Sequence, residues 1–332
     1  MQRGWILAVI LWGWAGPGWA AKNLQIHFID VEGGQATLLV APSGESLLVD
    51  TGWPGFNGRD AERIQKTAKK AGVKKIDHLL ITHYHTDHVG GVTQLAERME
   101  IGNFIVHGKN TETGKNAEAL QEALDRAAAK GKTTVVKVGD RIPLKGVEIE
   151  VLAARGEVTK KGGTPNPLCA GAMKKEDDPT ENARSIGFLL TFGKFKFLNL
   201  ADLTWNKEVE LMCPGNPVGK VDLYLSNHHG LAVSNPPQLV HATAPRVIVM
   251  NNGARKGGDI EAWKLFKGSP GLEDLWQMHF TVKAGKEGNV DDPYIANLES
   301  PGGQNLSVTA ESTGAFRVLN LRNKFEKVYA AR

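Results

Sequence analysis

Three histidines and an aspartate lie close together in the segment THYHTDHVGG, residues 82–91. The segment follows the apolar run IDHLLIT, which has the character of a strand buried on both faces, and it precedes a run typical of a helix. Open α/β sheets build their sites on loops of this kind, and imidazole and carboxylate groups suit zinc and its first-row neighbours as ligands. The segment therefore predicts a metal site, with a solvated polar loop as the alternative.

The spacing divides the four side chains into two pairs. His83 and His85 alternate along an extended loop, so they point the same way and can share one metal ion. Asp87 and His88 fall where the chain turns into a helix, so they point elsewhere and could hold a second ion. The pattern therefore leaves room for two metal ions.

A catalytic metal also needs ligands from distant parts of the chain, and polar side chains end other apolar strands. Asp202 ends the run FKFLNLAD, and its two carboxylate oxygens could bridge two ions. The run LYLSNHH ends in His228 and His229, which strand alternation sends to opposite faces, and His228 is preferred as the ligand. Five other histidines are expected to be core or surface residues within or beside strands or on helices: His27, His78, His107, His241 and His279.

The first twenty residues differ from the rest of the chain. They combine a basic start at Arg3, a short apolar run and small residues at Gly18 and Ala20, which is the pattern of a secretory signal cleaved after Ala20. The alternative is a membrane anchor, but the run is short for a bilayer core of roughly 30 Å. We therefore expect a signal peptide at 1–20 and a mature domain at 21–332, secreted or periplasmic and without stable membrane insertion.

Strands and helices alternate through residues 21–332 with hairpins among them, which predicts an α/β layered fold with mixed sheets. Two helices are expected near the C-terminus, around IEAWKLF and LEDLWQM. Residues 154–181 lack periodicity and predict a long functional or disordered loop. Cys169 and Cys213 could pair in an oxidising compartment or remain thiols elsewhere. The net charge of +4 is spread along the chain and does not by itself indicate nucleic-acid binding.

The motif HYHTDH, the earlier LLVDTG, the later NLAD and the final HH resemble the metallo-β-lactamase fold superfamily across essentially the whole mature chain. The segments IDVEGGQATLLV and ENARSIGFLLTFGKFKFLNLAD are most similar to the branch with the ComEC-type competence metal domain and the bacterial choline-phosphate esterase. The resemblance implies a four-layer αβ/βα sandwich of two mixed sheets, with two metal ions, usually zinc, at one edge. It implies metal ligands at His83, His85, Asp87, His88, Asp202 and either His228 or His229, and a supporting role for Asp50.

One ligand of many superfamily members is missing, because no histidine lies between His107 and His228. Asn182, in the segment TENARSIG, is the matching position, and the competence-type branch also has asparagine and serine there. One metal ion would then have three protein ligands, His83, His85 and Asp202.

Hydrolysis is the reaction class that such a centre predicts, because two metal ions lower the pKa of a bridging water toward about 7. Asp87 could both hold a metal and orient the nucleophile. A phosphodiester is the first choice of substrate, since Arg255 and Lys256 in NNGARKGG follow a strand end and could clamp phosphate. The alternatives are a lactone or β-lactam hydrolase, or a binding module with a degraded site. Nucleic acid is considered only as a possible substrate, and the sequence predicts no oligomeric state.

Overall fold

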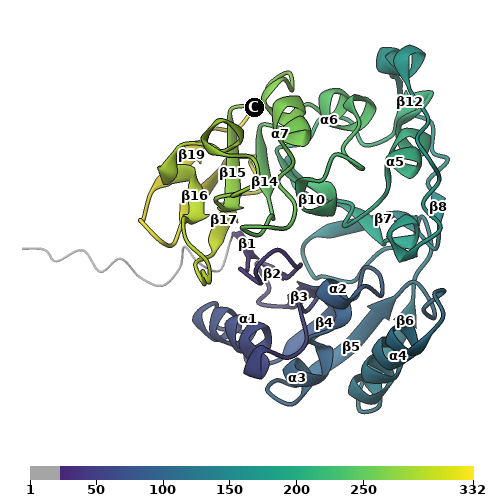
Figure 1. The fold of residues 1–332 in the computed structure, drawn as a ribbon, viewed down its shortest axis with the longest axis vertical. Helices are drawn as coiled ribbons and strands as arrows, with labels where there is room; N and C mark the ends of the chain where they lie inside the picture. Colours follow the sequence, from purple (N-terminus) through teal and green to yellow (C-terminus); the bar gives the residue numbers. More distant parts are fainter. Residues whose placement is uncertain (1–22) are drawn as a thin grey trace, which may run out of the picture.

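The computed structural model describes residues 23–332, so the expected signal at 1–20 lies outside the described part of the chain. Two large mixed sheets form the centre of the molecule, and helices lie on the outside of both (Figure 1). This arrangement confirms the expected α/β fold of two mixed sheets. No helix within residues 23–332 is long and apolar enough to cross a membrane.

The first sheet has nine strands in the order β19-β18-β17-β1-β2-β3-β4-β5-β6. Strands β3, β4, β5 and β6 run parallel to one another, whereas the other neighbouring pairs, including β2 and β3, are antiparallel. The strands are β1 (Leu24–Phe28), β2 (Thr37–Val40), β3 (Ser46–Val49), β4 (Ile76–Leu80), β5 (Ile101–Val106), β6 (Lys132–Val135), β17 (Leu306–Ala310), β18 (Phe316–Asn320) and β19 (Glu326–Tyr329).

The second sheet has eight strands in the order β16-β15-β14-β13-β11-β10-β7-β8. Its strands are β7 (Glu148–Ala154), β8 (Glu157–Val158), β10 (Gly187–Phe192), β11 (Phe195–Asn199), β13 (Leu223–Leu225), β14 (Val247–Met250), β15 (Asp274–His279) and β16 (Ile295–Asn297). The short strands β9 (Thr164–Pro165) and β12 (Gly215–Asn216) pair separately. The run LEDLWQM, expected to be a helix, instead supplies strand β15.

The two sheets pack face to face. Phe28 and Val49 of the first sheet share one buried cluster with Phe188 and Val249 of the second. Helices α1 (Arg59–Lys70), α2 (Thr86–Val89), α3 (Val92–Ala96) and α4 (Lys115–Ala128) lie in the half of the chain that builds the first sheet, and α5 (Trp205–Met212), α6 (Pro237–Thr243) and α7 (Ile260–Lys267) follow strands of the second.

Each sheet buries its outer face under helices. Helix α1 carries Ala61, Ile64 and Ala68 on one stripe, because residues three and four apart share a helix face, and this stripe packs with β4. Helices α5 and α7 use Leu211 and Phe266 in the same way against the second sheet. The layers are therefore helix, sheet, sheet and helix, as expected.

The long segment 154–181 is partly ordered by short elements and by a covalent bond. It contains β8, β9 and the 3-10 helix η3 (Pro167–Gly171). Cys169 in η3 forms a disulfide with Cys213, which directly follows α5. The bond ties this segment to the part of the chain that follows Asp202.

Candidate metal centre

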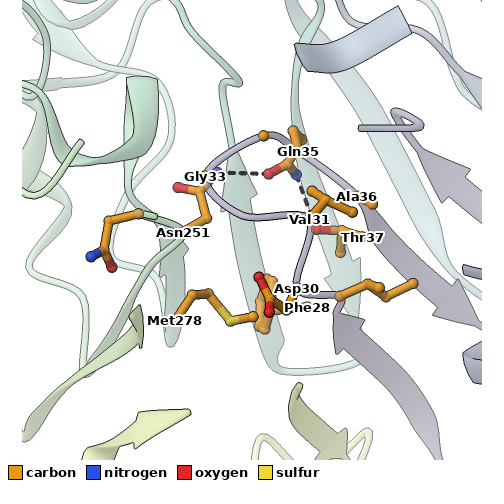
Figure 2. A pocket seen from close by; sticks show the side chains of 12 residues that line it. Phe28, Asp30, Val31, Gly33, Gln35, Ala36, Thr37, Asn251 and Met278 are labelled. Atoms are coloured by element: carbon orange, nitrogen blue, oxygen red, sulfur yellow. Dashed lines mark hydrogen bonds between the residues drawn. The ribbon is translucent and has the colours of Figure 1, made fainter. Parts of the chain in front are cut away.

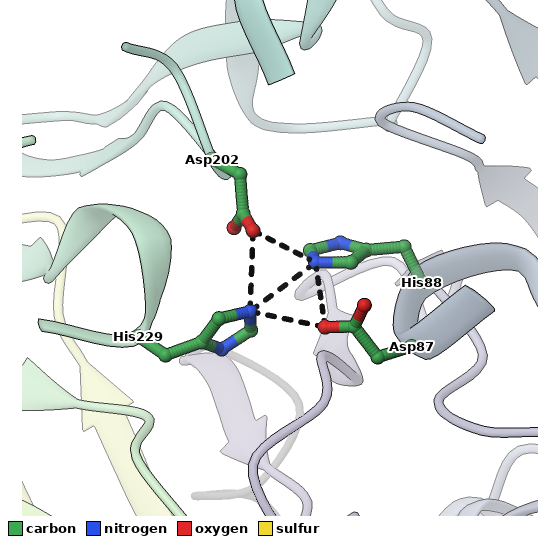
Figure 3. Close-up of side chains that lie close together, drawn as sticks. All are labelled: Asp87, His88, Asp202 and His229. Carbon is green, nitrogen blue, oxygen red and sulfur yellow. Dashed lines mark hydrogen bonds and ion pairs between the residues drawn. The ribbon is translucent and has the colours of Figure 1, made fainter. Parts of the chain in front are cut away.

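The expected ligands come from loops that follow strands of both sheets. Residues 82–88 follow β4, Asp202 follows β11, and the 3-10 helix η5 (Asn227–Gly230) follows β13. Because these strands end at the same edge of the packed sheets, their loops meet there, and Figure 3 shows four of the side chains pointing toward one another. These candidate ligands therefore lie together at one edge of the sheets.

Four potential ligands form a buried cluster: Asp87, His88, Asp202 and His229. Their ligand atoms all lie within 4.8 Å of one another. The Nε2 atom of His88 lies 3.3 Å from Oδ2 of both Asp87 and Asp202. The Nε2 atom of His229 lies 3.2 Å from Oδ2 of Asp87 and 3.3 Å from Oδ2 of Asp202. Two imidazoles and two carboxylates thus converge on one point (Figure 3).

The charges in this cluster depend on one another. Burial lowers the pKa of His88, but the carboxylates of Asp202 and Asp87 outweigh it and raise this pKa well above its ordinary value. Burial raises the pKa of Asp202, but the imidazoles of His229 and His88 hold it well below its ordinary value. The carboxylates therefore favour positive charge between them, and a divalent cation with these nitrogen and oxygen ligands fits that requirement.

His83 lies next to this cluster, and one of its ring nitrogens makes no hydrogen bond within the described residues. Its ring centroid is 4.0 Å from that of His88 and 4.7 Å from that of His85. Burial lowers the pKa of His83 well below its ordinary value, so the ring is neutral. Its buried Nε2 has no hydrogen-bond partner within residues 23–332. A neutral imidazole with an unsatisfied buried nitrogen fits a metal ligand.

His85 is held by a carboxylate on its far side. Its Nε2 donates to Oε1 of Glu112 across 3.1 Å. This bond leaves the lone pair on Nδ1, which is the arrangement of a metal-bound histidine with a supporting carboxylate. Glu112 lies between β5 and α4 and was not anticipated from the sequence.

Asp50 supports the histidine loop from behind, as the resemblance implies. Its Oδ2 accepts from Nδ1 of His88 at 2.8 Å and from Oγ1 of Thr82 at 2.7 Å. Its Oδ1 accepts from the backbone N–H of Thr82 at 2.8 Å. These bonds orient the His88 ring so that Nε2 faces the cluster.

The turn after β13 decides which histidine enters the cluster. His228 and His229 both have left-handed backbone conformations, with φ of 51° and 55°. The chain here is no longer a strand, so the alternation assumed from the sequence does not apply. The structure brings His229, rather than the preferred His228, into the group of four. The Nε2 atom of His228 lies 3.6 Å from Oδ2 of Asp202, at the border of the cluster.

Two amides continue the contacts of His229 into the protein. Nδ2 of Asn251 lies 3.2 Å from Nδ1 of His229 and donates to Oε1 of Gln35 at 2.6 Å. Gln35 in turn donates to Oγ1 of Thr37 at 3.0 Å. Figure 2 shows Gln35 between these partners in a narrow pocket under the loop that follows β1. The chain of amides holds the His229 ring in place.

Asn182 is the position that the resemblance matches to the missing histidine. It belongs to the 3-10 helix η4 (Glu181–Arg184), and Ser185, which directly follows η4, has its Oγ 3.4 Å from Nδ1 of His83. Asn182 is buried, and its Oδ1 has no hydrogen-bond partner within the described residues. Its Nδ2 donates to Asp178 across 3.4 Å.

Glu181 links η4 to the histidine loop, and sequence reasoning missed it. Its Oε2 accepts from Nε2 of His107 at 2.8 Å and from the backbone N–H of Tyr84 at 3.3 Å, and Oε1 accepts from Thr111 N–H at 2.8 Å. Burial raises the pKa of Glu181, but the bonds from His107 and Thr111 outweigh it and lower the pKa to about 2. In the sequence, the only feature that could have indicated this role was the position of Glu181 directly before Asn182.

The two cations expected at the mouth of the site differ in position. The ammonium group of Lys256 forms an ion pair with the carboxylate of Asp87 and lies 5.0 Å from the ring centroid of Trp53. Arg255 is exposed and forms no ion pair with residues 23–332. The structure thus brings Lys256 to the cluster and leaves Arg255 on the surface.

A second group of potential ligands lies away from this cluster: Asp30, Glu32 and His279. His279 was expected on a helix but ends strand β15, and its Nε2 donates to Asp30 at 2.7 Å. Arg63 lies 3.1 Å from both carboxylates. Because a cation of the protein already neutralises this group, we interpret it as a structural network.

Residues 30–167 match the family model described as "Metallo-beta-lactamase superfamily". Members of that superfamily are typically metal-dependent hydrolases, and this chain has a candidate metal site. The match confirms the resemblance drawn from the sequence.

Curated relatives agree with the predicted branch. "ComE operon protein 3" of Bacillus subtilis is 22% identical over 242 residues, which cover 69% of this chain and 28% of the relative. "Recombination protein 2" of Haemophilus influenzae is 22% identical over 231 residues, which cover 69% of this chain and 24% of the relative. "Ribonuclease Z" of Methanopyrus kandleri is 33% identical over 90 residues, covering 26% and 28%. The chain spans about a quarter of the length of these relatives.

Proposed function

We propose that the protein is an exported phosphodiesterase that uses two divalent metal ions, with zinc as the first candidate. The observation that carries the proposal is the buried convergence of Asp87, His88, Asp202 and His229, with the unsatisfied nitrogen of His83 beside them. No serine or cysteine nucleophile is needed for hydrolysis at such a centre.

The donor set divides between two ions. His83, His85 and Asp202 would hold one ion, and Asp87, His88 and His229, together with Asp202, would hold the other. When bound, the ions supply Lewis-acid chemistry and generate a nucleophile from water at neutral pH. The first ion has one protein ligand fewer, because Asn182 stands where many superfamily members have a histidine, so we expect it to bind more weakly.

Lys256 supports a phosphodiester rather than a neutral substrate. Its ammonium group forms an ion pair with Asp87 of the cluster and lies over the ring of Trp53. A phosphodiester develops negative charge on several oxygens during hydrolysis, and a fixed cation beside the metal ions stabilises that charge. The name of the ribonuclease relative also describes a phosphodiester-cleaving enzyme.

The test compares metal-loaded protein on an activated phosphodiester, a lactone and a β-lactam. We expect the phosphodiester to be cleaved fastest. Lys256→Ala should lower its turnover by about 10-fold to 100-fold, the effect of one charge-assisted bond of roughly 1.5 to 3 kcal/mol. Arg255→Ala is the matched control, because it removes a neighbouring cation that lies outside the cluster. Turnover of the lactone or β-lactam without phosphodiester cleavage would reject the proposal in favour of the alternatives.

Export is supported by the pattern of residues 1–20 and by the disulfide between Cys169 and Cys213, since such bonds persist in oxidising compartments. N-terminal sequencing of protein recovered outside the cytoplasm of the producing cells should give Ala21 as the first residue. An intact Met1 on cytoplasmic protein would contradict export.

A further inference from the structure

A second cavity, outside the metal-ligand cluster, has a positively charged lining. It has a volume of about 440 Å³. Its only carboxylate, that of Asp178, already accepts hydrogen bonds from Thr180 N–H at 2.7 Å and from Nδ2 of Asn182 at 3.4 Å. Four cationic residues line the cavity: Lys109, Arg155, Arg184 and Lys207. The cavity therefore has a clear excess of positive charge.

Most of this charge is not neutralised by the protein. Lys207 pairs with Glu210 at 2.9 Å, but the other three cations form no ion pair with residues 23–332. The guanidinium groups of Arg155 and Arg184 each lie next to the backbone of a glycine. A Cβ atom on Gly108 would come within 3.9 Å of the Arg155 guanidinium, and one on Gly156 within 4.0 Å of that of Arg184. The arginine forks are therefore free to bind an anion in the cavity.

The cavity belongs to the same sheet edge as the metal-ligand cluster. His107 follows β5, Arg155 follows β7, and Lys207 lies on α5, which begins shortly after Asp202. Between the two sites lies η4: Glu181 bonds to the histidine loop at Tyr84, and Arg184 at its other end lines the cavity. The same short segment therefore contacts both the histidine loop and the cavity.

Arg155 has a backbone conformation that its residue type does not favour. Arg155 and Gly156 form the two-residue turn between β7 and β8, with φ of 58° and 83°. Turns with two positive φ values favour asparagine, aspartate or glycine at the first position. An arginine there costs backbone energy, and such costs are found where a side chain has a function. Its guanidinium group is the candidate for that function.

We propose that this cavity binds a second phosphate of a polynucleotide strand whose scissile phosphodiester lies at the metal centre. The inference rests on the proposed function and names its substrate class. A planar guanidinium group binds phosphate oxygens through two parallel hydrogen bonds. A small diester has a single phosphate and cannot occupy both sites. None of the large exposed apolar side chains of residues 23–332 lines the cavity, which disfavours a lipid headgroup in a membrane.

Binding of a short labelled oligothymidylate with cleavage-resistant phosphorothioate linkages tests the proposal, with metal-loaded full-length mature protein and fluorescence anisotropy as the readout. Arg155→Asn and Arg184→Gln should each raise Kd by about 10-fold to 100-fold. The slope of log K against log salt should become shallower by about 0.7 for each lost phosphate contact. Asparagine suits the turn at 155, so Arg155→Asn should fold at least as stably as the wild type.

The matched control is Lys69→Gln with Lys70→Gln, which removes two exposed cations from α1; this helix lies across the molecule from β7 and β8 in Figure 1. These changes should leave Kd and the salt slope within about twofold of the wild type, because they lie far from the cavity. An equal loss of binding in the control would show diffuse attraction and overturn the proposal. Unchanged binding in both arginine variants would also overturn it, as would binding to phosphatidylglycerol vesicles without binding to the oligonucleotide.

The outcome is separable from that of the proposed function. If no phosphodiester is hydrolysed, the proposed function fails, but a loss of oligonucleotide binding in the two arginine variants would still support the cavity as a phosphate site. If both activities are present, the ratio of kcat/KM for an oligonucleotide to kcat/KM for a small diester should fall about tenfold or more in Arg155→Asn.

Discussion

Oδ2 of Asp50 lies 2.8 Å from Nδ1 of His88, and both side chains are fully buried. This contact turns Nε2 of His88 toward the ligand cluster, and with a metal ion bound Nδ1 would keep the proton that it donates to Asp50 while Nε2 would supply the lone pair. Asp50 therefore positions a candidate metal ligand, His88, although it is not itself one of the converging residues.

We expect Asp50→Asn to weaken metal binding by about 10-fold to 100-fold, the usual effect of losing a supporting carboxylate. An asparagine would present an N–H group where the carboxylate now accepts bonds from His88 and Thr82. Competition with a chelator of known zinc affinity measures the effect. Asp77→Asn is the matched control, because Asp77 accepts bonds from Ser46 at the start of β4, far from the site. Equal zinc affinities in the two variants would contradict the role of Asp50.

Asp202→Ala should lower the occupancy of both metal ions. Its Oδ2 lies 3.3 Å from Nε2 of both His88 and His229, at the centre of the cluster. His83→Ala should chiefly remove one ion, because His83 lies at one side of the cluster. Elemental analysis of the purified variants distinguishes the two cases. Two ions retained in Asp202→Ala would rule out the bridging role.

Much of the candidate site could be predicted from local patterns. The loop 82–88 and Asp202 each follow a buried strand, and the structure brings these strand ends together at one edge of the sheets. The choice between His228 and His229 could not be predicted, because it depends on left-handed backbone angles in a turn. The assumption of strand alternation fails because the strand ends at Leu225, and two further residues separate this end from His228.

Contacts between segments far apart in the chain could not be predicted from the sequence, for a different reason. Glu112, Glu181 and Lys256 acquire their roles only through partners 27 to 169 residues away. The run LEDLWQM shows the same limit for the fold. Its periodicity suits a helix, but Leu275 and Trp276 are both buried, on opposite faces of a strand that pairs with β14 and β16. Tertiary packing overrides local propensity there.

The disulfide between Cys169 and Cys213 should contribute to stability. It closes a loop across a sequence separation of 44 residues, which corresponds to about 4 kcal/mol in the chain-entropy model. We expect Cys169→Ser with Cys213→Ser to lower the free energy of unfolding by an amount of this order. Denaturant titrations with and without reductant measure it, and the double variant should not respond to the reductant. Two free thiols in unfolded, unreduced protein would show that the bond is absent.

Glu208 predicts a loss of stability as the pH rises. It lies on α5, is fully buried, and accepts hydrogen bonds from Asn227 and from the backbone N–H of Asn235. Burial raises the pKa of Glu208 from about 4.5 to about 8, and these bonds only partly oppose the shift. The folded state therefore binds more protons than the unfolded state between these two values. The stabilising contribution of the protonated Glu208 carboxyl is complete below about pH 4.5 and is lost as the pH rises through 8.

We therefore expect Glu208→Gln to remove a slope on the order of 1 kcal/mol per pH unit from the free energy of unfolding across this interval. Glutamine keeps an acceptor for Asn227 and Asn235 but cannot ionise, so the variant should be more stable than the wild type near pH 8. Denaturant titrations between pH 5 and pH 9 measure the difference. Glu210→Gln on the same helix is the control, because Glu210 is partly exposed and paired with Lys160 and Lys207. A wild-type pH slope that persists in Glu208→Gln would show that another group titrates.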